Sequence, residues 1–177
     1  MVDICNDKMG KPYDKCKRAF DKAKRKCKKK MKALNFPPFS FRIETRAGKD
    51  YIWDEVRGKW YVLTPEEWVR QHSVQYLHQV LKQPLGRMGL EVILDKNRPK
   101  RSDIVVYNSD FKPHILVECK RPSLVIAQQS FDQIARYNLQ LQADYLMVTN
   151  GLSHYYARIN TVEKRYDFLQ ALPTYRA

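Results

Sequence analysis

The sequence predicts an α/β fold of the α+β kind, in which helices flank one mixed sheet. Short β-rich runs separated by turn residues fill residues 34–63, which indicates a meander of strands. Two stretches with helical spacing of apolar residues, 64–81 and 126–141, each lie between β-rich runs. Two further runs, 102–107 and 114–120, flank a turn and predict a hairpin. Strands and helices in this order are typical of a sheet covered by helices.

The meander is expected to have three strands, 41–46, 51–54 and 60–63, joined by turns over 47–50 and 56–59. Aromatic side chains recur on all three strands. Aromatic residues in strands form either part of a core or a surface on which bases stack. We favour the core.

The first helix has a well-defined start. Thr64 can serve as the N-cap, Pro65 suits the first helical position, and Glu67 stands where a capping box places its acid. The helix is expected to end near Leu81.

A basic loop over 95–101 leads into the hairpin, and the second helix follows the hairpin. The remaining strands are expected over 90–94, 144–149, 154–159 and 166–169.

Each strand of the predicted hairpin carries one acid near the end remote from the turn. Counting outward from the turn puts Tyr107 opposite His114, Val105 opposite Leu116 and Asp103 opposite Glu118. Opposed residues on one sheet face have Cβ atoms about 4.5–5.5 Å apart, and Lys120 shares the face of Glu118. Two carboxylates that close repel unless a cation lies between them. Hard oxygen ligands favour Mg²⁺, with Mn²⁺ as a possible substitute.

The positive charge is concentrated at one end of the chain. Residues 1–33 hold 11 Lys and 2 Arg against 4 Asp, and so contribute +9 of the net +14. We expect a basic Cys- and Lys-rich extension over 1–33, disordered or helical, and one domain over 34–177. The extension is either a solvated tail or an arm that binds nucleic acid. Met31 is an alternative start, because a new composition begins there.

The cysteines and the hydropathy pattern predict a reducing, cytoplasmic location. Cys5, Cys16 and Cys27 are spaced by eleven residues, Cys119 lies inside a predicted strand, and no Cys-x-x-Cys motif is present. No apolar run reaches the ~18–20 residues of a membrane span, and no signal peptide is visible. Residues 1–33 nevertheless weakly resemble a cysteine-bearing segment of DC-STAMP-like multi-pass membrane proteins.

The hairpin acids form the pattern Asp-x14-Glu-x-Lys, which resembles the site of PD-(D/E)xK, restriction-endonuclease-like nucleases. Further segments from about Met31 to Tyr175 resemble the N-terminal domain family of type I restriction enzyme R subunits. These segments are Leu63–Gln71, Arg101–Tyr107, Leu116–Lys120, Phe131–Asn138 and Tyr145–Gly151.

This resemblance implies a restriction-endonuclease-like core that hydrolyses DNA phosphodiester bonds. Asp103 and Glu118 would hold Mg²⁺, and Lys120 would act in catalysis. The helix acid of the family corresponds to Glu67 or Glu66; we favour Glu67, although its capping-box role competes. The Gln-x-x-x-Tyr motif falls on Gln133 and Tyr137, which would support the metal-binding residues or contact DNA, as would Arg101. The alternative for this motif is a core Tyr137 and a solvated Gln133.

One departure limits the resemblance. The sequence has no Gly-x4-Gly-Lys-Ser/Thr motif for ATP, so we expect a stand-alone nuclease-like domain or a piece of a larger system. The expected partner is DNA, with other restriction-system subunits or a separate motor as further candidates, and no membrane is expected. The competing hypotheses are a non-catalytic DNA-binding or assembly module that keeps the fold, and a protein-interaction domain.

Overall fold

A computed structural model describes residues 31–93, 101–160, 163 and 165–175. The chain divides into two units, Met1–Met31 and Lys32–Ala177. The predicted helix and the three cysteines of the basic extension lie outside the described residues, as does most of the basic loop 95–101. Everything below concerns the second unit.

The described residues of the second unit form two sheets and two principal helices. A three-stranded sheet has the order β1-β2-β3, and a six-stranded sheet has the order β4-β5-β6-β7-β8-β9. Only β6 and β7 pair in parallel among the described strands, so the larger sheet is mixed, as predicted. The strands are β1 Ile43–Arg46, β2 Lys49–Asp54, β3 Lys59–Val62, β4 Met88–Ile93, β5 Arg101–Tyr107, β6 Pro113–Cys119, β7 Tyr145–Thr149, β8 His154–Asn160 and β9 Arg165–Leu169. The helices are α2 Pro65–Gln75, followed by a π-helical turn Tyr76–Val80 and a 3-10 turn Leu85–Arg87, and α3 Gln128–Leu141.

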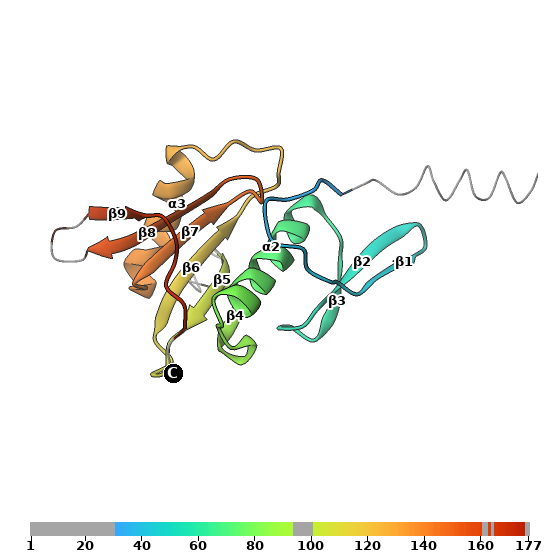
Figure 1. The fold of residues 1–177 in the computed structure, drawn as a ribbon, viewed down its shortest axis with the longest axis horizontal. Coiled ribbons are helices and arrows are strands. Elements are labelled where there is room, and N and C mark those ends of the chain that lie inside the picture. The colour runs from blue at the N-terminus through green and yellow to red at the C-terminus, as the bar shows by residue number, and fades with distance from the viewer. Residues whose placement is uncertain (1–30, 94–100, 161–162, 164, 176–177) are drawn as a thin grey trace, which may run out of the picture. The chain divides into compact units, whose positions relative to one another are not determined.

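The two helices cover opposite faces of the larger sheet. Alternate residues of β5 and β6 point to opposite sides of the sheet. Ile104 and Val117 pack in the core with Val69 of α2, whereas Val105 and Leu116 pack with Ile134 of α3. Helix α2 also lies between the large sheet and the β1–β3 meander (Figure 1). One face of α2 therefore packs in the core, which leaves the N-terminal turn of the helix available to contact the edge of the large sheet.

Helix α2 begins as the sequence predicts. The Thr64 hydroxyl accepts a hydrogen bond from the backbone N–H of Glu67 at 3.0 Å, and Pro65 occupies the first turn. The second half of the capping box is missing, because the backbone N–H of Thr64 bonds to the carbonyl of Val62 instead. The carboxylate of Glu67 is thus left for other partners.

The register of the β5–β6 hairpin matches the prediction near the acids and departs from it near the turn. Val105 pairs with Leu116 as expected, and one further step of the same register puts Asp103 beside Glu118. The prediction that Tyr107 faces His114 was wrong, because an irregularity after Val106 pairs Tyr107 with Pro113.

The cause lies in the turn. The side chain of Asn108 accepts hydrogen bonds from the backbone N–H groups of Asp110 and Lys112, both at 3.0 Å, and closes a shorter loop than expected. The register shift lies between Val106 and Tyr107, on the turn side of the hairpin, so it does not reach the acids.

Candidate functional site

The carboxylate of Asp103 lies between two strands and a helix. Its Oδ2 accepts a hydrogen bond from the backbone N–H of Cys119 on β6 at 2.7 Å. Its Oδ1 accepts one from Nη2 of Arg70 on α2 at 2.8 Å. The side chain is 15% exposed. Asp103 therefore faces the end of β6, where the sequence places Glu118 and Lys120.

Glu118, Lys120 and Gln133 form a closed triangle of hydrogen bonds. Oε1 of Glu118 accepts from Nζ of Lys120 at 2.6 Å and from Nε2 of Gln133 at 2.8 Å. Lys120 also donates to Oε1 of Gln133 at 3.3 Å. Gln133 lies on α3, so the second helix reaches the same edge of the sheet. We call the group Asp103, Glu118, Lys120 and Gln133 the acidic edge.

The electrostatics of the acidic edge are set by burial and by the proximity of its acids. Burial and the neighbouring charge of Asp103 raise the pKa of Glu118 to about 7, although the Lys120 ammonium opposes the shift. Burial alone lowers the pKa of Lys120, but the hydrogen bond and charge of Glu118 outweigh it, and the pKa is raised. Asp103 and Glu118 are thus close enough to repel each other, as the sequence predicts.

A cluster of buried ions lies next to the acidic edge and connects it to the meander. Nη2 of Arg57, from the β2–β3 turn, donates to Glu67 at 2.7 Å, and Nε donates to Asp54 at 2.6 Å. Arg70 contacts Glu67 with Nη1 and Asp103 with Nη2. Burial lowers the pKa of Arg70, but Asp103 and Glu67 outweigh that effect, and the pKa is raised. We call Asp54, Arg57, Glu67, Arg70 and Glu91 the ion cluster.

The two adjacent acids of α2 have different surroundings. Glu67 is buried and accepts hydrogen bonds from Arg57, Arg70 and Gln71. Glu66 is half-exposed, and burial and the charge of Asp103 raise its pKa while Arg70 and Lys120 oppose the shift. The contacts place Glu67, the acid favoured from the sequence, in the ion cluster, and Glu66 lies 3.9 Å from Nη2 of Arg70; the choice of the helix acid stays a prediction.

Four residues of the ion cluster escaped the sequence prediction: Asp54, Arg57, Arg70 and Glu91. Arg70 stands four residues after Glu66 on a predicted helix, and that spacing is a signal for an ion pair. Glu91 interrupts the otherwise apolar β4 with a left-handed backbone (φ 51°), and its Oε2 accepts from Nη1 of Arg57 at 2.7 Å. Arg57 belongs to a turn, and no local pattern connects it with α2.

The two other predicted contacts are Arg101 and Tyr137. Arg101 is the first residue of β5 and is exposed, and its backbone pairs with Ile93 of β4. Tyr137 lies on α3, four residues after Gln133, but its side chain is outside the described residues. Its role stays a prediction.

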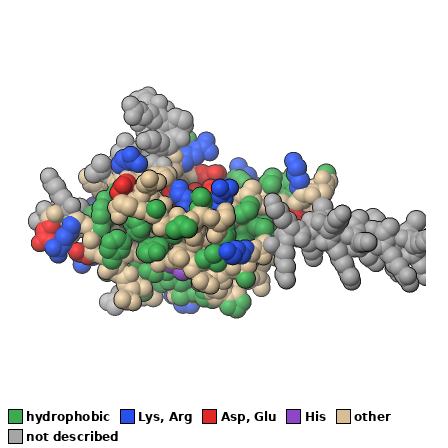
Figure 2. Space-filling view, turned by 90° about the horizontal axis from the view of Figure 1, so that it is seen from above, with side chains coloured by type: hydrophobic (Ala, Val, Ile, Leu, Met, Phe, Trp, Pro, Cys, Tyr) green, Lys and Arg blue, Asp and Glu red, His purple; other side chains and the backbone are tan. Residues whose placement is uncertain are grey.

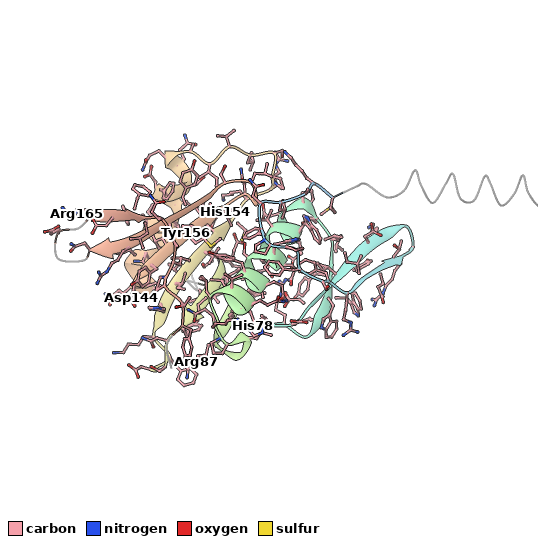
Figure 3. All side chains as sticks on the ribbon, viewed as in Figure 1. His78, Arg87, Asp144, His154, Tyr156 and Arg165 are labelled. Atoms are coloured by element: carbon pink, nitrogen blue, oxygen red, sulfur yellow. The ribbon has the colours of Figure 1, made fainter. Side chains whose placement is uncertain are left out.

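The described residues hold no cluster of three or more His, Cys, Asp or Glu side chains arranged to bind a metal ion. The histidines take other partners: His72 contacts the carbonyl of Trp68, and His114 contacts Asp144 at 2.7 Å. His78 and His154 lie far apart, on different elements (Figure 3). In the acidic edge, Glu118 Oε1 accepts from Lys120 and Asp103 Oδ1 accepts from Arg70.

The face of the molecule seen in Figure 2 carries charges of both signs. Figure 2 shows Lys and Arg side chains scattered among hydrophobic and neutral ones, with acidic side chains beside them. No helix in the described part of the chain is long and apolar enough to cross a membrane.

Comparison with known proteins assigns residues 65–173, within the second unit, to a family. The family described as "Type I restriction enzyme R protein N terminus (HSDR_N)" matches residues 65–173, from the first residue of α2 to beyond β9. A second family, the Dcst2 domain, matches residues 1–38, most of which lie outside the described residues. No curated protein and no solved structure matches the chain. The family match covers more than half of the sequence and includes Asp103, Glu118, Lys120 and Gln133, and the chain therefore belongs to the type I restriction enzyme R protein N-terminal family.

Proposed function

We propose that this protein is a Mg²⁺-dependent deoxyribonuclease that hydrolyses DNA phosphodiester bonds at the acidic edge. The observation that carries the proposal is the pair of repelling carboxylates, Asp103 and Glu118, held at the ends of adjacent strands with Lys120 beside them. This is the arrangement that the sequence resemblance implies for a nuclease of this family.

The charge balance around the edge supports a bound cation. Six carboxylates face three basic groups, which leaves an excess of three negative charges when all are ionised. The acids are Asp54, Glu66, Glu67, Glu91, Asp103 and Glu118, and the bases are Arg57, Arg70 and Lys120. DNA phosphates are repelled by such a site unless cations neutralise it. Carboxylate oxygens are the donors that Mg²⁺ prefers.

The proposed roles follow from the contacts. Asp103 and Glu118 would hold Mg²⁺, or Mn²⁺ in its place, which supplies polarisation of the phosphate and activation of a water. Lys120, already within hydrogen-bond reach of Glu118, is placed to donate to a phosphate oxygen or to orient the attacking water. Gln133 fixes the rotamer of Glu118 from α3. The water oxygen bonds to phosphorus as the bond to the leaving oxygen breaks, which yields a phosphate monoester and a hydroxyl.

The half-exposed Glu66 is proposed as the helix acid of the site, in addition to Asp103 and Glu118. It lies four residues before Arg70, and its pKa is shifted upward by the charge of Asp103 and downward by that of Lys120. Glu67 supports the site indirectly, because it holds Arg57 and Arg70 in place. Arg101, exposed at the start of β5, is proposed to contact DNA.

The test is plasmid cleavage by the full-length protein with Mg²⁺ or Mn²⁺, compared with the same reaction in EDTA. We expect nicked or linear DNA only with the metal. Isothermal titration of Mn²⁺ provides a second measurement, since Asp103→Asn should weaken binding. Cleavage that persists in EDTA would contradict the proposal.

A second candidate is a DNA-binding or assembly module that keeps the fold without cutting. It is favoured by the fact that both oxygens of Asp103 already accept hydrogen bonds within the protein, one of them from Arg70. Salt-sensitive DNA binding without metal-dependent cleavage would identify this case. The family match suggests DNA and other restriction-system subunits as partners in either case.

A further inference from the structure

The outer face of the β1–β3 meander carries aromatic and basic side chains together. Trp53 on β2 pairs with Trp60 on β3, and Arg46 on β1 pairs with Lys49 on β2. The alternation of strand side chains puts Tyr51 and Arg42 on this same face, and the backbone N–H of Trp53 bonds to the carbonyl of Arg42 at 2.9 Å. We call Arg42, Arg46, Lys49, Tyr51, Trp53 and Trp60 the aromatic–basic face.

The opposite face of the meander is the one that packs against the rest of the second unit. Ile52 and Asp54 are fully buried. Asp54 accepts a hydrogen bond from Gln71 of α2 at 2.7 Å and forms an ion pair with Arg57. The aromatic–basic face is therefore the solvent side of a sheet that is firmly attached to α2.

The rings and the guanidinium groups of this face are stacked on one another. The two indoles meet edge to face, with centroids 5.5 Å apart. The guanidinium carbon of Arg42 lies 4.9 Å from the Trp53 ring and 5.6 Å from the Trp60 ring, and that of Arg46 lies 5.2 Å from Trp60. Arg46 is also 5.4 Å from the ring of Tyr51.

This composition complements single-stranded nucleic acid. Arg42, Arg46 and Lys49 are exposed and face one acid, Glu44, so the face has a positive excess. Bases stack on aromatic rings whatever their identity, and exposed cations pair with phosphates. An exposed arginine can leave the aromatic ring it covers and pair with a phosphate instead, which makes the ring available for stacking with a base. A duplex offers no free base faces to the rings.

The meander also lies outside the stretch that defines the family. Residues 39–64, which include all three strands, are matched by neither family. Arg57, in the turn between β2 and β3, nevertheless contacts Glu67 and Glu91 of the ion cluster. A single strand of nucleic acid bound on the meander would thus be held by an element that contacts the ion cluster, next to the acidic edge.

We propose that the aromatic–basic face binds single-stranded nucleic acid, with bases stacked on Trp53 and Trp60 and phosphates paired with Arg42, Arg46 and Lys49. The proposal goes beyond hydrolysis at the acidic edge and does not depend on it, because binding on this face needs no metal.

The test is titration of the full-length protein with oligothymidylate of about 15 nucleotides in EDTA, followed by tryptophan fluorescence. The chain has three Trp, two of them on this face and none in residues 1–33. The third, Trp68, donates from Nε1 to the carbonyl of Lys32 at the end of the extension at 3.2 Å, so it is the loss of quenching in variants of the aromatic–basic face that identifies this face. We expect saturable quenching that is weaker with a duplex of the same length. Arg42→Gln combined with Arg46→Gln should weaken binding at least about tenfold, and should lower the salt slope by about 1.4, at about 0.7 per cation.

The matched control is Lys112→Gln combined with Arg165→Gln, which removes the same charge from exposed positions elsewhere and should leave quenching unchanged. Lys49→Gln, at the β1–β2 turn, tests the phosphate contacts with the aromatic stack intact and should lower the salt slope by about 0.7. Circular dichroism shows whether each variant is folded. Absence of quenching, equal quenching by duplex, or wild-type affinity in folded variants of this face would overturn the proposal. Loss of cleavage alone would contradict only the proposed hydrolysis.

Discussion

The guanidinium of Arg70 on α2 donates from Nη2 to Oδ1 of Asp103 on β5 at 2.8 Å. The same guanidinium contacts Glu67 with Nη1, so one side chain connects the buried helix acid with the strand acid. This ion pair joins the ion cluster to the acidic edge. The buried acid of the ion cluster, Glu67, can be distinguished from the proposed catalytic acids Asp103 and Glu118 by measuring stability and cleavage separately.

We expect Glu118→Gln and Lys120→Ala each to reduce Mg²⁺-dependent plasmid nicking at least about 100-fold, because each removes a group that would act on the transition state. The control is Asp144→Asn, which removes an exposed carboxylate paired with His114 near the start of β7. Its rate should equal that of the wild type. Undiminished cleavage by both Glu118→Gln and Lys120→Ala would refute the assignment.

Arg70→Met should lower the free energy of unfolding by about 3–5 kcal/mol, because it removes the cation paired with Asp103 and leaves the buried Glu67 with Arg57 alone. Urea denaturation measures the loss. Arg165→Met removes a cation from an exposed pair with Asp167 and should cost less than about 1 kcal/mol. Equal small losses for the two variants would show that the Arg70 pairs are not structurally important.

Removal of the charge should affect cleavage at Glu66 and stability at Glu67, the two acids of α2. Glu66→Gln should slow cleavage while leaving stability within about 0.5 kcal/mol, because the side chain is half-exposed. Glu67→Gln should instead destabilise the fold by about 2 kcal/mol or more, since it weakens buried contacts with Arg57 and Arg70. Paired urea and cleavage measurements distinguish them. The reverse pattern would restore Glu67 as the helix acid of the site.

The raised pKa of Glu118 predicts a pH dependence of stability without metal. An unfolded glutamate titrates near 4.5, whereas the folded pKa is raised to about 7. Between these values the folded state holds a proton that the unfolded state has lost, so the contribution of this group to stability falls as the pH rises. Above about pH 7 the contribution stays constant at its lowest value.

Urea denaturation in EDTA from about pH 5 to pH 8 tests this dependence. Glu118→Gln lacks the titration, so its stability should rise relative to the wild type across the window. Mg²⁺ added near pH 8 should stabilise the wild type more than the variant. A difference between the two proteins that does not change with pH would exclude the raised pKa.

The sequence by itself determined the local elements and the identity of the acidic edge. Short β-rich apolar runs on either side of a turn defined β5 and β6, Thr64 and Pro65 defined the start of α2, and the hairpin register brought Asp103 opposite Glu118. Such features depend on neighbours in the chain or across one hairpin, which residue patterns encode directly. The Gln133 contact with Glu118 was expected from the family resemblance, and the contact is present.

Only the tertiary structure decided which partners the charged groups take. Arg57 reaches Glu91 and Arg70 reaches Asp103 across more than thirty residues of sequence, and no local spacing signals such contacts. Glu66 and Glu67 are adjacent in the sequence, but they differ in exposure and partners because of how the N-terminal turn of α2 packs on the sheet. Likewise, the strand pattern gave the meander two faces, but packing against α2 decided that Ile52 is buried and the Trp53–Trp60 pair lies on the solvent side.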